Sequence, residues 1–124
     1  MDNVEYEYFE FLVDTANQSY NQKFQLNKNV KLIHGILFTS TLEEMIYYRG
    51  RQRIEINGRE YFPQGYETKL LMTSLNISPN DKYYELGGVK PGDGIIKINY
   101  QDTDHPRFSL SPYKVQMYVK CEIE

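Results

Sequence analysis

The alternation of apolar and polar residues with a period of two is the feature that most constrains the fold of this chain. It is clearest in residues 113–123, where every second residue from Val115 to Ile123 is apolar or Cys and the residues between them are mostly polar. Side chains two residues apart on a strand point to the same face, so this pattern predicts a strand with one buried face. Shorter runs with the same period recur along the chain, and Gly, Pro, Asn and Asp separate them.

These runs predict about eight strands. The expected strands cover residues 4–13, 23–28, 30–39, 67–75, 82–86, 94–100 and 113–123, together with two hairpin arms within residues 53–62.

The strongest local signal is the pair Asn57-Gly58, which lies between β-prone residues. Both central residues of a type I′ turn need a positive φ, and Asn-Gly meets that need best, so the pair predicts a two-residue hairpin. The resulting register places Glu55 opposite Glu60, Ile56 opposite Arg59 and Ile54 opposite Tyr61. We expect Pro63 to end the second arm, since proline cannot donate a ladder hydrogen bond.

Two segments need a separate interpretation. In residues 30–39, Val30, His34 and Phe38 would share one face with the other even-numbered residues, while Ile33 and Leu37 would share the opposite face. Both faces are partly apolar, which predicts a central strand covered on both sides. Ser40 and Glu43 have the spacing of a capping box, which predicts one helical turn within residues 42–48 before the chain returns to a strand.

Together these patterns predict an all-β fold. We expect a single antiparallel β-sandwich or jelly-roll-like domain of about eight strands over residues 1–124, with at most one short helix; an immunoglobulin-like strand order is the alternative. The N-terminus lacks a secretion signal, and no run approaches the ~18 apolar residues of a membrane span. We therefore expect a soluble product made in the cytoplasm.

Charge is unevenly distributed along the chain. The net charge of −3 argues against a nucleic-acid-binding domain. Arg49, Arg51 and Arg53 are spaced by two, so on a strand they would project from one face, close to Tyr47 and Tyr48. Tyr and Arg are enriched at protein interfaces, although three arginines could equally serve to solvate an outer face.

The first predicted strand is acidic, and residues 1–14 contain no basic residue. Glu5 and Glu7 share one face of that strand, and we expect them to meet the arginine-bearing face within the chain or on another copy. The residues of this candidate interface are Glu5, Glu7, Tyr47, Tyr48, Arg49, Arg51 and Arg53.

Catalytic motifs are missing from the sequence. It has no nucleophile elbow, phosphate loop or zinc-ligand spacing, so we expect no enzyme activity and no cofactor. His34 and the lone Cys121 are interpreted as core residues. Asp102 and Asp104, which precede His105, are the candidate metal ligands and would favour calcium; the alternative is an acidic turn.

The stretch HGILFTSTLEEMIYYRGRQRIEINGREYFPQGYETKLLM, about a third of the chain, resembles small β-sandwich virion structural proteins of tailed bacteriophages, such as capsid auxiliary, head-fibre or tail-attachment proteins. The resemblance implies homo-oligomeric assembly on a virion, without a cofactor or catalytic residue.

The expected function is therefore a non-enzymatic structural or assembly protein. It would act through contacts with other protein subunits, as a homo-oligomer or in a larger assembly, and without a membrane or nucleic-acid partner. The alternative is a carbohydrate- or ligand-binding β-sandwich, calcium-dependent through the Asp102/Asp104 loop. In that case Tyr47, Tyr48, Tyr83 and Tyr84 would form a platform for stacking on a sugar.

Overall fold

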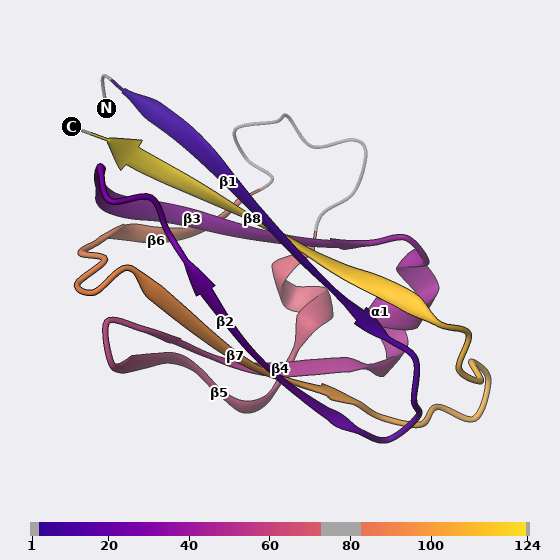
Figure 1. Ribbon diagram of the computed structural model, residues 1–124. Helices are drawn as coiled ribbons and strands as arrows, with labels where there is room; N and C mark the ends of the chain where they lie inside the picture. Colours follow the sequence, from indigo (N-terminus) through magenta and orange to yellow (C-terminus); the bar gives the residue numbers. More distant parts are fainter. Residues whose placement is uncertain (1–2, 73–82, 124) are drawn as a thin grey trace.

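The structure is a computed structural model, and it describes residues 3–72 and 83–123. The chain folds into a sandwich of two antiparallel four-stranded sheets, which lie one above the other in Figure 1. The strands are β1 (Val4–Val13), β2 (Ser19–Gln25), β3 (Val30–Ser40), β4 (Gly50–Ile56), β5 (Arg59–Glu67), β6 (Tyr84–Val89), β7 (Ile95–Asp102) and β8 (Tyr113–Ile123). The helical elements are α1 (Glu43–Arg49) and the 3-10 turn η1 (Thr68–Leu71).

The strand order is that of a jelly roll. One sheet has the order β1-β8-β3-β6, which we call the first sheet, and the second sheet has the order β2-β7-β4-β5. Strand β1 pairs with β8, β2 with β7, β3 with β6 and β4 with β5, as if one long antiparallel ribbon had been rolled up. The predicted all-β sandwich is thereby confirmed, and the immunoglobulin-like order is not the one adopted.

The core lies between the sheets and follows the period-two pattern. The inward side chains of β8 from Val115 to Cys121 are at most 1% exposed, as are Ile54, Ile56 and Ile96 of the second sheet. Helix α1 contributes Met45 and Ile46 to this core, and η1 contributes Leu71. In the described part of the chain, neither helical element has the length or the apolar composition needed to cross a membrane.

The predicted hairpin joins β4 to β5. Asn57 and Gly58 have φ values of 55° and 72°, as a type I′ turn requires. Glu55 lies opposite Glu60 and Ile56 opposite Arg59, as expected, but Ile54 lies opposite Phe62 instead of Tyr61. The register shifts by one residue here, so Tyr61 is the extra residue that a β-bulge inserts into the second arm.

A second bulge changes the predicted faces of β3. The register with β8 shifts between Ile33 and Gly35, so the alternation restarts at His34. The buried face contains Ile33 before the bulge and Ile36 and Phe38 after it, and all three residues are fully buried. The prediction had placed even-numbered residues on one face along the whole strand. The strand is nevertheless central, between β8 and β6, as its apolar residues predicted.

Several predicted boundaries are wrong. Strand β5 continues past Pro63 to Glu67. It is an edge strand with a neighbour on one side only, so the N–H group that proline lacks need not interrupt its hydrogen bonds with β4. Residues 68–71 form η1 instead of a strand, and residues 73–75 and 82 of the predicted strands lie outside the described residues. Helix α1 has seven residues, its N-cap is Leu42, and the Ser40 hydroxyl accepts a hydrogen bond from the Leu42 N–H instead of capping Glu43.

Candidate functional site

The three predicted interface arginines do not share a face. Arg49 is the last residue of α1 and is 1% exposed, whereas Arg51 and Arg53 lie on the outer face of β4. The expectation of one arginine-bearing strand face is therefore wrong for Arg49. The reason is local: helix α1 ends at Arg49 and β4 begins only at Gly50, so the spacing by two does not place Arg49 on the strand.

Arg49 is held by carboxylates and a backbone carbonyl. Its Nε donates to Asp102 Oδ1 at 3.1 Å and its Nη2 donates to Asp102 Oδ2 at 2.6 Å. The same Nη2 lies 3.1 Å from Asp104 Oδ1, and Nη1 donates to the Phe108 carbonyl at 2.7 Å. The hydrogen bond with Asp102 is the main cause that raises the pKa of Arg49. This cluster connects α1 to the loop between β7 and β8.

The same network includes the candidate metal ligands. The buried Asp102 also accepts hydrogen bonds from the Tyr113 hydroxyl at 2.8 Å and from the Asn17 N–H at 3.1 Å. Hydrogen bonds from the Asn17 side chain and from Arg49 lower the pKa of Asp104. The guanidinium thus occupies the place between the two carboxylates where a cation would bind. Within residues 3–72 and 83–123, no group of three or more His, Cys, Asp or Glu side chains is arranged to hold a metal ion.

Two buried tyrosines extend this network into the core. The hydroxyls of Tyr100 and Tyr113 lie 2.9 Å apart, and burial raises the pKa of both phenols far above the usual value. Both phenols therefore stay protonated, and the network joins β7 and β8 across the sandwich. Arg49, Asp102, Tyr100 and Tyr113 are buried and bonded in a chain, so the role of this network is structural.

The acidic residues of β1 do not meet the arginines within this chain. Asn27, in the turn after β2, donates its backbone N–H to Glu7 Oε2 and its side-chain amide to Glu5 Oε1, each at 2.9 Å. Arg51 instead pairs with Glu67 at 3.5 Å, and Arg53 lies 3.3 Å from Glu60 and 3.8 Å from Glu55. Arg53 thereby offsets the repulsion between the facing carboxylates of the hairpin.

The four tyrosines expected to form a sugar platform lie in different places. Tyr47 and Tyr48 belong to α1, where Tyr48 stacks on Phe108 with ring centroids 4.1 Å apart and lies 5.2 Å from His105. Tyr84 of β6 packs edge-on against Phe62. Tyr83 lies at the outer face of the first sheet, against Tyr6. No continuous platform results beside the Asp102/Asp104 loop.

Cys121 and His34 were both expected to be core residues, and only Cys121 is one. Cys121 is fully buried, and burial raises the pKa of its thiol to about 12, which leaves it a poor nucleophile. His34 is half-buried, with its Nε2 3.0 Å from Glu122 Oε1 on the outer side of the first sheet. The expectation of a core histidine is therefore wrong, because the bulge in β3 turns His34 outward.

Sequence reasoning missed an aromatic cluster on the outer face of the first sheet. Tyr8 and Tyr118 lie opposite each other on β1 and β8 with ring centroids 5.0 Å apart, and Tyr6 and Tyr83 lie 5.7 Å apart. We call these four residues the tyrosine face. Tyr6 is 54% exposed and Tyr8 is 45% exposed, so both rings present apolar surface to solvent. The signal that could have found Tyr6, Tyr8 and Tyr118 is their even spacing along β1 and β8, on the faces opposite the core.

Gly35 is the reason that Tyr83 can reach this face. A Cβ at position 35 would lie 2.8 Å from the Tyr83 Cβ, which is closer than side chains approach. The absence of a side chain on β3 therefore allows Tyr83 to lie across the sheet. Leu37 of β3 is the cross-strand partner of Tyr118, and its side chain is only 8% exposed.

Charged residues of both signs flank the tyrosine face. At the end of the sheet near α1, Lys114 lies 3.6 Å from Glu10, which also accepts a hydrogen bond from the Tyr8 hydroxyl at 2.6 Å. At the opposite end, Lys31 lies 3.6 Å from Glu122.

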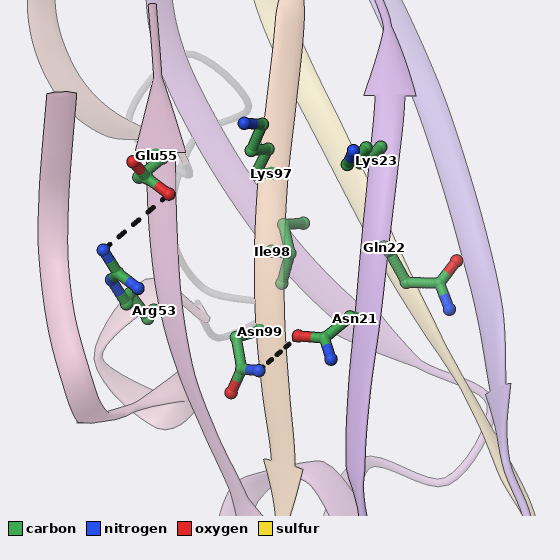
Figure 2. Close-up of a pocket in the computed structure, with 8 residues that line it drawn as sticks. All are labelled: Asn21, Gln22, Lys23, Arg53, Glu55, Lys97, Ile98 and Asn99. Carbon is green, nitrogen blue, oxygen red and sulfur yellow. Dashed lines mark hydrogen bonds and ion pairs between the residues drawn. The ribbon is translucent and has the colours of Figure 1, made fainter. Parts of the chain in front are cut away.

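The outer face of the second sheet is polar and hollowed. A shallow pocket of about 510 Å³ spans β2, β7 and β4, and Figure 2 shows the residues that line it. They are Asn21, Gln22, Lys23, Arg53, Glu55, Lys97, Ile98 and Asn99. The two outer faces of the sandwich thus differ in chemistry: one is aromatic and the other is built from amides and charges.

Comparison of the chain with protein-family models, with curated proteins and with solved structures found no match, so the site is interpreted from its own geometry.

Proposed function

We propose that this domain is a non-enzymatic structural protein that assembles with a second copy of itself through the tyrosine face. The observation that carries the proposal is the gathering of Tyr6, Tyr8, Tyr83 and Tyr118 on the outside of one sheet. Exposed aromatic clusters rimmed by polar residues mark interaction sites, and tyrosine is among the residues that contribute most to binding energy at interfaces.

The charges around the cluster favour a second copy as the partner. Glu10 and Lys114 lie at one end of the face, and Lys31 and Glu122 lie at the other, so each end carries both signs. A two-fold interface brings one patch against itself, and it needs such a self-complementary distribution. When two copies stack face to face, the lysine of one end can meet the glutamate of the partner's opposite end.

The edge of the sheet disfavours a different kind of self-association. Strand β1 is an edge strand of ten residues, and a long edge can pair with the edge of another chain. Glu5, Glu7 and Glu10 all lie on this strand, and antiparallel pairing of two β1 strands would bring these carboxylates together. Association through the face of the sheet avoids that repulsion.

A virion is the setting that we propose for this assembly. The support is the resemblance of residues 34–72 to small virion proteins of tailed bacteriophages, together with a strand order that viral capsid domains also use.

The test is the mass of the protein in solution, measured by light scattering behind a sizing column over a range of protein and salt concentrations. We expect a mass that rises with concentration towards twice the 14.7 kDa of one chain. Tyr8→Ala should weaken the dimer by roughly a thousandfold, because the two-fold interface loses one aromatic anchor from each copy and each loss costs about 2 kcal/mol.

Tyr47→Ala is the matched control, since Tyr47 is also 45% exposed but lies on α1, outside the tyrosine face. It should leave the dimer unchanged. A monomer at every concentration would refute self-assembly, and equal effects of the two variants would refute the tyrosine face as its interface.

A further inference from the structure

The polar outer face of the second sheet brings two lysines together. Lys23 on β2 and Lys97 on β7 are direct cross-strand partners, and both side chains are exposed on the same face. Figure 2 shows them at the same level of neighbouring strands, above the amides of Asn21 and Asn99. Like charges that lie directly opposite each other on adjacent strands destabilise a sheet.

Neighbouring carboxylates do not neutralise this pair. Glu55 is the cross-strand partner of Lys97 on β4, but its carboxylate lies 3.8 Å from Arg53, towards which Figure 2 shows it directed. Among the residues that the structure describes, no carboxylate lies within ion-pair distance of Lys23 or Lys97. The described residues that line the pocket thus include three cationic side chains and one anionic side chain, in a protein whose net charge is −3.

Hydrogen-bonding groups lie beside the lysines. Asn99 donates its side-chain N–H to the Asn21 side-chain oxygen, which leaves the Asn21 amide N–H groups and the Asn99 side-chain oxygen to face the pocket. The pocket therefore combines cations with both a donor and an acceptor. Amide groups of this kind match the hydroxyls of a sugar, which both donate and accept.

We propose that this pocket binds an acidic oligosaccharide, whose carboxylate or sulfate groups would lie between Lys23 and Lys97 and whose hydroxyls would contact Asn21 and Asn99. An anion held between the two ammonium groups relieves their repulsion. This proposal concerns the sheet opposite the tyrosine face and does not depend on self-assembly.

Nucleic acid fits the pocket less well than an acidic sugar. Proteins bind single strands by stacking bases on aromatic side chains, and none of the described residues that line this pocket is aromatic. Glu55 adds a negative charge that would oppose a continuous phosphate backbone, whereas the spaced anionic groups of a saccharide can avoid it.

The test is calorimetric titration of the full chain at low salt with four probes. Tetragalacturonate supplies carboxylates and a heparin-derived tetrasaccharide supplies sulfates, so these two probes distinguish the sources of the anionic group. Maltotetraose is the neutral sugar control, and an eight-nucleotide oligothymidylate tests the nucleic-acid alternative. We expect binding of one or both acidic sugars that weakens at least tenfold between 50 and 500 mM salt, and no binding of maltotetraose.

Matched charge variants locate the binding site. The double variant Lys23→Gln/Lys97→Gln should weaken binding of the acidic sugar at least tenfold. Lys28→Gln/Lys90→Gln makes the same change in net charge at exposed positions outside the pocket, and its affinity should stay within twofold of the wild type.

One further variant separates binding from stability. Lys23→Glu converts the like-charged pair into an opposite-charged pair, because Lys97 is the cross-strand neighbour of this edge position. It should raise the melting temperature and also abolish binding of the acidic sugar. Failure of both acidic sugars to bind at millimolar concentration would overturn the proposal. So would equal losses in the two double variants, or tighter binding of the oligothymidylate.

Discussion

At the scale of single residues, Arg49 is the side chain on which the end of the sandwich near α1 depends. Its guanidinium is bound by two carboxylates and by the Phe108 carbonyl, and its exposed fraction is 1%. Replacing one member of a buried ion pair leaves the other charge uncompensated in a medium of low polarity. A surface ion pair has no such penalty, since water solvates whichever charge is left.

We therefore expect Arg49→Met to lower the free energy of unfolding by about 3–5 kcal/mol, measured by urea denaturation. Arg51→Met is the control: the Arg51–Glu67 pair is 43% and 39% exposed, and its loss should cost under about 1 kcal/mol. If Arg49→Met is too unstable to purify, Arg49→Lys should be intermediate. Equal costs for the Met variants at positions 49 and 51 would contradict the structural role of Arg49.

The candidate site shows what single residues in the sequence can and cannot predict. Arg49, Arg51 and Arg53 are evenly spaced in the sequence, which predicted that they share one strand face. Arg49 is buried instead, because it is the last residue of α1 and does not belong to the strand. Asp102 and Asp104 were predicted as metal ligands or as an acidic turn, whereas their observed partner, Arg49, lies more than fifty positions away in the chain. Such a pairing depends on strand order, which local patterns do not contain.

At the scale of elements, the Asn57-Gly58 turn sets the register of the β4–β5 hairpin. Gly58 has φ of 72°, a conformation that costs a residue with a side chain roughly 1–2 kcal/mol. Open space surrounds the position, so a methyl group there would meet no atom within 4 Å and the effect of a substitution would come from the backbone alone.

Gly58→Ala should accordingly lower the free energy of unfolding by roughly 1 kcal/mol, as read from the shift of the urea midpoint. Asn57→Gly keeps a residue that accepts positive φ and should change the midpoint little. If Gly58→Ala leaves the urea midpoint unchanged, the turn does not need its type I′ geometry.

Elements were predictable where the pattern was regular and unpredictable where it was interrupted. Strand β8 was predicted with its observed bounds because its alternation is unbroken. The bounds of β1 were also predicted, although its apolar residues change from even to odd positions at Phe9. The bulges near Ile33 and Tyr61 were missed, because an inserted residue leaves the composition of a strand unchanged and alters only its phase. The extension of β5 past Pro63 was missed because it follows from an edge position, which only the complete sheet defines.

At the scale of the whole molecule, most strand pairs join distant parts of the chain. Val4 of β1 pairs with Glu122 of β8, and β2 pairs with β7, whereas the hairpin of β4 and β5 is a local pairing. Two strands that are distant in the sequence can pair only after the long chain segment between them has closed into a loop. This closure costs conformational entropy before any contact between the strands is formed.

Refolding should therefore be slow for a domain of this size, on the order of milliseconds to seconds. Stopped-flow dilution from urea can follow it through the fluorescence of the 12 tyrosines, since the chain contains no tryptophan. Refolding in microseconds would contradict the role of the distant pairs in limiting the rate.

The pairing of β1 with β8 also decides how the molecule would respond to tension. The two strands are antiparallel neighbours, and the first residue of β1 lies beside the last residues of β8 at one end of the sandwich (Figure 1). A force that pulls Val4 and Ile123 apart would act perpendicular to the two strands, parallel to the hydrogen bonds between them. The hydrogen bonds would then break one after another, starting from that end, because the force acts on one pair at a time. A chain pulled in this way should unzip at low force, although the same sandwich could resist a pull applied along its strands.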